Sequence, residues 1–238
     1  MAKPKLLFLP GLACDAEVWA HQVRHFGAIT TTCAADYGTS DSIEKMARAA
    51  LRGMPEEFTV AGHSMGGRVA YEIYRSAPGR VKGLALLDTA YRPRAEGGAG
   101  EREHSERMAL VEIAQSQGMR AMGRSWMPKI IHPDRLTDTA LTDSIVEMFG
   151  RKTPEIYRTQ VCALLKRPDA TPVLDATRCP TLVLCGRQDT WSPVAQHEEI
   201  ASRIAGSELK IIERCGHMAP MERPEEVTAA LAAWFARL

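Results

Sequence analysis

Residues 58–70 read FTVAGHSMGGRVA, and this stretch predicts the fold. It begins with a short apolar run containing a β-branched pair, which is typical of a buried strand. Apolar residues return at helical spacing from Met65 onward. Gly62 and Gly66 flank Ser64 in the pattern G-x-S-x-G, so a strand, a tight turn and a helix are expected in that order. We expect the Ser64 hydroxyl to stand clear of the sheet in a strained turn, at the N-terminus of the helix.

Short apolar segments alternate with amphipathic ones on both sides of this stretch. Further strands are predicted at residues 5–9, 29–33, 81–87, 180–185 and 208–212. Continuous apolar strands that alternate with helices indicate right-handed βαβ units. The predicted fold class is therefore α/β, with a doubly wound, mostly parallel sheet flanked by helices.

Residues 91–178 interrupt this alternation. They contain no strand signal, and helical segments are predicted near residues 101–117, 119–127, 139–149 and 153–166. We expect residues 1–90 and 179–238 to form the core. Residues 91–178 would then be a helical insertion after the fourth strand.

Net charge and cysteine spacing exclude several classes of binding partner and metal site. The 238 residues carry a formal net charge of +1, so neither nucleic acid nor a membrane is expected as a partner. The apolar run at residues 6–9 is too short for a signal peptide. The six cysteines form no CxxC pair and have no zinc-ligand spacing, which predicts free thiols and a cytoplasmic location. The sequence leaves monomer and dimer open.

Two polar residues follow later strands and complement Ser64. Asp189 follows the strand at residues 180–185, and His217 follows the strand at residues 208–212. A serine hydroxyl needs a base to accept its proton, and the base needs an anion that holds its tautomer. Loops after parallel strands meet at one edge of the sheet, and the order Ser, Asp, His is the one expected for this architecture.

Four segments resemble the α/β-hydrolase superfamily: LLFLPGLACD, FTVAGHSMGG, PTLVLCGRQDTWSP and LKIIERCGHMAPMERPEEV. The resemblance implies that Ser64 is the nucleophile, His217 the base and Asp189 the acid. It also implies an oxyanion hole made by the backbone N–H groups of Leu12 and Met65.

In this family the helical insertion is a cap, so residues 91–178 resemble a cap and the pocket is expected between it and the sheet. Trp191 either lines this pocket or packs its own loop. Met122, Met127 and Phe149 are candidate substrate-binding residues from the insertion. Many relatives carry His-Gly where this chain has Pro10 and Gly11, but a backbone donor does not depend on the histidine.

Some assignments stay open from the sequence. Asp88 also ends a strand, and some relatives place the acid there; the segment GRQDTWSP favours Asp189. His63 is interpreted as a structural residue that points away from the nucleophile. Three further histidines are expected at the surface, namely His104, His132 and His197.

We expect a serine hydrolase that cleaves a small carboxylic ester through an acyl-enzyme, with no metal or organic cofactor. Thioester hydrolysis, acyl transfer and carbon–carbon bond cleavage are alternatives on the same three residues. A ligand sensor that keeps the fold is an alternative of a different class.

Overall fold

A single six-stranded sheet forms the centre of the molecule. The computed structural model describes residues 5–238, and its strands lie in the order β2-β1-β3-β4-β5-β6 with every neighbouring pair parallel. The strands are β1 (Lys5–Leu9), β2 (Thr31–Ala34), β3 (Phe58–His63), β4 (Val81–Leu87), β5 (Thr181–Gly186) and β6 (Glu208–Ile212). The predicted doubly wound α/β fold is confirmed.

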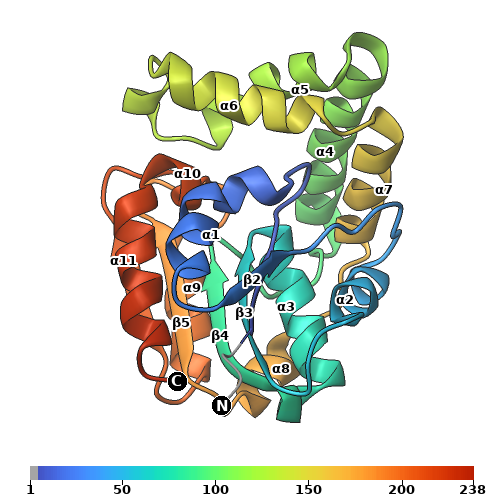
Figure 1. Ribbon diagram of the computed structural model, residues 1–238. Helices are drawn as coiled ribbons and strands as arrows, with labels where there is room; N and C mark the ends of the chain where they lie inside the picture. Colours follow the sequence, from blue (N-terminus) through green and yellow to red (C-terminus); the bar gives the residue numbers. More distant parts are fainter. Residues whose placement is uncertain (1–4) are drawn as a thin grey trace.

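Helices cover both faces of this sheet, which explains why its inner strands are buried. Every residue of β3 and β5 is buried. Figure 1 shows α1 and α11 on one side of the sheet and α2 and α3 on the other. The flanking helices are α1 (Ala20–Gly27), α2 (Ile43–Leu51), α3 (Met65–Ser76), α8 (Thr171–Ala176), α9 (Val194–Arg203), α10 (Ala219–Glu222) and α11 (Pro224–Phe235).

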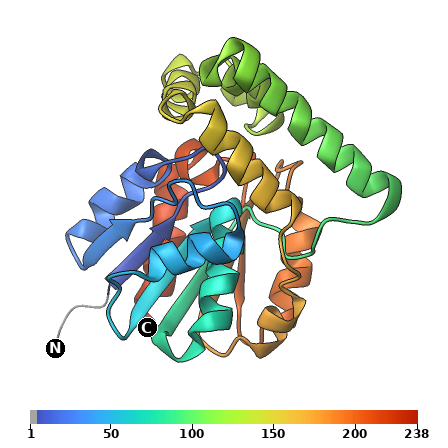
Figure 2. The same cartoon turned by 90° about the vertical axis from the view of Figure 1, so that its right-hand side faces the viewer.

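Four helices between β4 and β5 gather at one end of the molecule, as Figures 1 and 2 show. They are α4 (Gly97–Gln117), α5 (Met119–Trp126), α6 (Thr139–Gly150) and α7 (Pro154–Leu165). Helix α4 packs on α5 and α7, and α5 packs on α6. Helix α8, which follows α7, instead contacts α3 and α9 beside the sheet. The division into a core and a cap at residues 91–178 stays a prediction.

Two predicted elements differ in detail from the structure. The second strand was expected at residues 29–33 and lies at Thr31–Ala34. The helix that Asp15 caps begins as a 3-10 turn at Ala16–Trp19 before α1 continues it. The Asp15 carboxylate accepts a hydrogen bond from the Glu17 N–H, as expected for an N-cap residue.

Candidate functional site

Ser64 occupies the tight turn between the last residue of β3 and the first residue of α3. Its φ of 55° and ψ of −116° lie in a region that residues other than glycine rarely adopt. The Ser64 N–H donates to the carbonyl of Leu87 at 2.8 Å, and the Ser64 carbonyl accepts from the Thr89 hydroxyl at 2.7 Å. These bonds hold the strained turn against the end of β4.

Two glycines let the turn close. A Cβ on Gly62 would overlap the carbonyl of Gly66, and a Cβ on Gly66 would overlap the carbonyl of Leu9. Both contacts are with backbone, which cannot move aside as a flexible side chain can. The G-x-S-x-G pattern is therefore a steric requirement of this strand–turn–helix junction.

The structure brings Ser64, His217 and Asp189 into one hydrogen-bonded row. His217 Nε2 lies 2.8 Å from Ser64 Oγ, and His217 Nδ1 lies 2.8 Å from Asp189 Oδ2. The other carboxylate oxygen of Asp189 accepts from the N–H groups of Trp191 and Ser192, both at 2.8 Å. The side chains of His217 and Asp189 are almost fully buried. The acid is thus fixed by its own loop and aimed at the histidine.

Asp88 follows the last residue of β4, the strand beside β5. Its carboxylate lies near Gly186 and His63 rather than beside His217. Its Oδ1 accepts from the Gly186 N–H at 3.0 Å, and its Oδ2 is 3.8 Å from His63 Nε2. Complete burial, together with the charge of Asp189, raises the pKa of Asp88 well above its usual range. Asp88 is therefore a buried carboxyl group that supports the start of the Asp189 loop.

His63 and Glu222 hold the backbone on either side of the His217 side chain. His63 Nε2 donates to the His217 carbonyl at 2.8 Å, and burial followed by the proximity of His217 lowers the pKa of His63 to about 3. Glu222 Oε1 accepts from the N–H groups of Gly216 and Met218. The geometry agrees with a structural role for His63. No sequence pattern pointed to Glu222.

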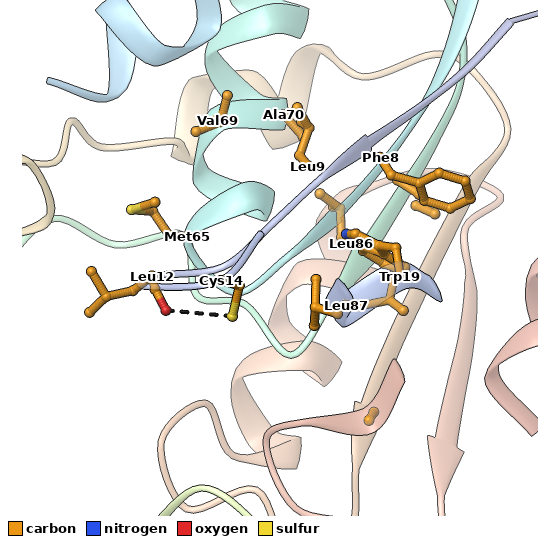
Figure 3. Packing of buried hydrophobic residues seen from close by; sticks show 14 of the residues in the cluster. Phe8, Leu9, Leu12, Cys14, Trp19, Met65, Val69, Ala70, Leu86 and Leu87 are labelled. Carbon is orange, nitrogen blue, oxygen red and sulfur yellow. Dashed lines mark hydrogen bonds between the residues drawn. The ribbon is translucent and has the colours of Figure 1, made fainter. Parts of the chain in front are cut away.

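The residues expected to form the oxyanion hole line the same cavity as Ser64. Figure 3 shows Leu12 in the loop after β1 and Met65 in the first turn of α3. Within residues 5–238, neither the Leu12 N–H nor the Met65 N–H has a hydrogen-bond partner. Gln160 of α7 accepts from the Ala13 N–H at 3.0 Å and so ties the Leu12 loop to α7.

The cavity beside Ser64 has a volume of about 300 Å³. Its walls come from loops at the carboxyl ends of the strands and from α3, α4, α5, α7 and α9. They include Trp191, as the sequence allowed, together with Trp126 and Leu164. Its charged lining, which no sequence motif indicated, comprises Arg68, Glu103, Glu106, Arg107 and Arg167.

Three side chains suggested as substrate contacts do not line this cavity. Met122 and Phe149 are completely buried, and Met127 is nearly so. The Phe149 ring stacks on Trp126, with ring centroids 5.7 Å apart, so it supports a residue of the cavity wall from behind. The sequence showed that these residues are apolar and lie in helices. It did not determine the direction in which their side chains point.

The prediction of a surface position for His197 is wrong. His197 is completely buried in α9, where its Nε2 accepts from the Thr89 N–H at 3.0 Å and its Nδ1 lies 3.2 Å from the Pro193 carbonyl. Burial lowers its pKa to about 4. His104 is exposed as expected, and His132 is partly buried.

Two further features are absent from residues 5–238. No group of three or more His, Cys, Asp or Glu side chains there is arranged to hold a metal ion. No helix in that range has both the length and the apolar composition needed to cross a membrane.

Comparison with known proteins gives consistent matches over nearly the whole chain. The family model described as "Alpha/beta hydrolase family" matches residues 5–230. The (E)-2-((N-methylformamido)methylene)succinate hydrolase of Acinetobacter baylyi is 26% identical over 96% of this chain and 89% of its own. The pimeloyl-[acyl-carrier protein] methyl ester esterase of Aromatoleum aromaticum is 23% identical over 95% of this chain and 96% of its own. A thermophilic esterase from Thermogutta terrifontis, solved with malate bound, has a TM-score of 0.87 and 26% identity over 99% of this chain and 90% of that chain.

Proposed function

The chain belongs to the alpha/beta hydrolase family, and from that premise we propose that it is a serine hydrolase of small carboxylic esters. The observation that carries the proposal is the hydrogen-bonded row of Ser64, His217 and Asp189 beside a cavity. Relatives named as a hydrolase and as a methyl ester esterase are consistent with it. In this proposal Ser64 is the nucleophile, His217 the base and Asp189 the acid.

The first half of the reaction forms an acyl-enzyme. Ser64 Oγ attacks the ester carbonyl while His217 Nε2 accepts the hydroxyl proton. Asp189 keeps the other ring proton on Nδ1 and stabilises the positive charge that develops on the imidazole. His217 then donates its Nε2 proton to the alkoxy oxygen, and the alcohol leaves.

The second half releases the acid. A water molecule gives a proton to His217 Nε2 and attacks the acyl carbon, and the proton returns to Ser64 Oγ as the ester bond to the enzyme breaks. The N–H groups of Leu12 and Met65 would donate to the oxyanion of both tetrahedral intermediates. Donors of this kind typically contribute a factor of roughly 10²–10³ in rate each.

Turnover of 4-nitrophenyl acetate and butyrate by the purified protein tests this proposal, with Ser64→Ala as the matched control. We expect saturable turnover that Ser64→Ala lowers by at least about 10³-fold. A panel of acyl thioesters and acyl acceptors then separates ester hydrolysis from thioester hydrolysis and acyl transfer on the same residues. Binding of ligands without turnover of any ester or thioester would instead favour the sensor alternative.

A further inference from the structure

Arg68 lies at the start of α3, four residues after Ser64, and both residues line the cavity. The Arg68 N–H donates to the Ser64 carbonyl at 3.4 Å, so the two residues are neighbours at the start of the helix. Only 7% of Arg68 is exposed. A cationic side chain is thus buried in the wall of the site, within one turn of the proposed nucleophile.

This guanidinium has no anionic partner. Its Nη1 donates to the carbonyl of Arg92 at 2.7 Å, and no carboxylate among residues 5–238 forms an ion pair with it. A guanidinium carries five N–H donors, so most of those of Arg68 are free to bind a ligand. A buried charge without a counter-ion is costly, and proteins ordinarily pair it.

Nearby charges do not neutralise Arg68. Glu103 is taken by two other arginines of the cavity: both of its oxygens accept from Arg167, at 2.7 and 2.9 Å, and Oε1 also accepts from Arg107 Nε at 2.9 Å. Glu106 lines the cavity from an exposed position. Three arginines and two glutamates leave one positive charge in excess around the cavity.

The electrostatics of Arg68 agree with this imbalance. Burial, followed by the neighbouring charge of Arg167, lowers the pKa of Arg68 to about 9. Arg68 therefore stays charged at neutral pH, in surroundings that a bound anion would stabilise. Within residues 5–238, the Arg68 guanidinium therefore forms no ion pair that would explain its charge.

We propose that Arg68 binds a carboxylate of the substrate, so that the preferred substrates are acidic esters such as the half-esters of short dicarboxylic acids. The inference rests on the proposed ester hydrolysis and names its substrate class. A planar guanidinium fork matches a carboxylate. The excess of one positive charge matches a carboxylate better than a phosphate dianion, and the cavity of about 300 Å³ suits a small molecule.

The first test compares esters that differ only in the carboxylate. We would measure kcat/KM for monomethyl succinate, glutarate and adipate against methyl butanoate, pentanoate and hexanoate. The pairs 3-acetoxypropanoate and propyl acetate, and 4-acetoxybutanoate and butyl acetate, place the carboxylate on the alcohol side. We expect at least one acidic ester to exceed its neutral partner by about 10- to 100-fold, as for other hydrogen bonds to charged groups.

Variants assign this preference to Arg68. Arg68→Met should abolish this preference, measured as the ratio of kcat/KM within each pair, and Arg68→Lys should retain part of it. Arg68→Gln keeps a donor for the Arg92 carbonyl and replaces Arg68→Met if the latter fails to fold. Arg158→Gln, which removes an exposed charge from α7, is the matched control and should leave the preference unchanged. Neutral esters preferred in every pair, or a preference that survives Arg68→Met, would overturn the inference.

A binding measurement separates this inference from the proposed function. Titration calorimetry of Ser64→Ala with succinate, glutarate and adipate should detect binding that the double variant Ser64→Ala/Arg68→Met loses. Binding of this kind without hydrolysis of any ester would support the carboxylate site and contradict the proposed hydrolysis. Hydrolysis of neutral esters, together with no acidic preference and no binding of these acids, would contradict the carboxylate site alone.

Discussion

Asp88 and Asp189 follow the adjacent parallel strands β4 and β5, but only Asp189 contacts His217, at 2.8 Å from Nδ1. Asp88 has a raised pKa because it is buried and close to Asp189. We therefore predict that Asp189→Asn lowers kcat strongly, by up to roughly 10⁴-fold, because an amide favours the wrong tautomer of the histidine.

Asp88→Asn is the matched comparison, since the Asp88 carboxyl is buried, has a raised pKa and does not contact His217. We expect it to change kcat/KM for 4-nitrophenyl butyrate far less than Asp189→Asn does. Parallel kinetics on the two variants, with circular dichroism as the folding control, decide the assignment. A larger loss of kcat/KM in Asp88→Asn would identify Asp88, which follows β4, as the acid.

We predict that buried His197 makes the free energy of unfolding depend on pH. Burial lowers its pKa to about 4, compared with the ordinary histidine value of 6.5. Between these values the unfolded chain binds a proton that the native state does not. Its contribution to stability is therefore present above pH 6.5 and is lost as the pH falls toward 4, with a slope approaching ~1.4 kcal/mol per pH unit.

Urea unfolding at pH 7, 6, 5 and 4 measures this slope. His197→Gln should flatten it, whereas His104→Gln, at an exposed histidine, serves as the control. Buried His63 adds a slope of the same sign, because its pKa is also lowered. An identical pH dependence in wild type and His197→Gln would show that His197 is not buried as a neutral group.

Substitutions of Leu164 and Met122 should have different effects, one on substrate selectivity and the other on stability. Leu164 lines the cavity, whereas Met122 is completely buried away from it. Leu164→Ala should shift the preference among acyl chain lengths, by roughly 1–3 kcal/mol of discrimination per lost methylene contact. Met122→Ala should instead lower the free energy of unfolding by about 2–5 kcal/mol, with little change in that preference.

The two variants are compared by kcat/KM for acetyl to octanoyl esters and by urea unfolding. Equal chain-length profiles for wild type and Leu164→Ala would mean that acyl chains do not contact this wall. A shifted profile in Met122→Ala would mean that the helix α5 packing determines the cavity shape.

Glu222 is predicted to position the His217 loop through three backbone N–H groups, those of Gly216, Met218 and His132. Glu222→Ala removes all three acceptors, and each buried donor left without a partner costs about 1–3 kcal/mol. We expect lower stability and a lower kcat in the fraction that remains folded. Unchanged stability would show that water replaces the carboxylate without cost.

The row of Ser64, His217 and Asp189 could be predicted from sequence because each residue follows a predicted strand. Carboxyl ends of parallel strands converge on one edge, so strand order and loop position were enough. The lining from α4, α5 and α7 could not be predicted in this way. Helical periodicity predicts which face of a helix is apolar, but it does not predict what packs against that face. Met122 and Phe149 were therefore indistinguishable from cavity residues such as Leu164.

The partners of charged groups and the burial of polar groups were harder to predict from the sequence. The spacing of four from Ser64 to Arg68 was visible, yet nothing in the sequence showed that the guanidinium lacks a carboxylate partner. His197 was misplaced because a histidine in a polar helix is usually exposed. Its burial depends on the Thr89 N–H that it meets from another part of the chain.

The central claim is that Ser64 is the nucleophile, and covalent labelling tests it most directly. The intact protein would be treated with a fluorophosphonate, and the modified residue would be located by mass spectrometry of its peptides. We predict one adduct per chain on Ser64, slower labelling in His217→Gln, and none in Ser64→Ala. Full labelling of Ser64→Ala, or an adduct on another residue of the wild-type chain, would contradict the account.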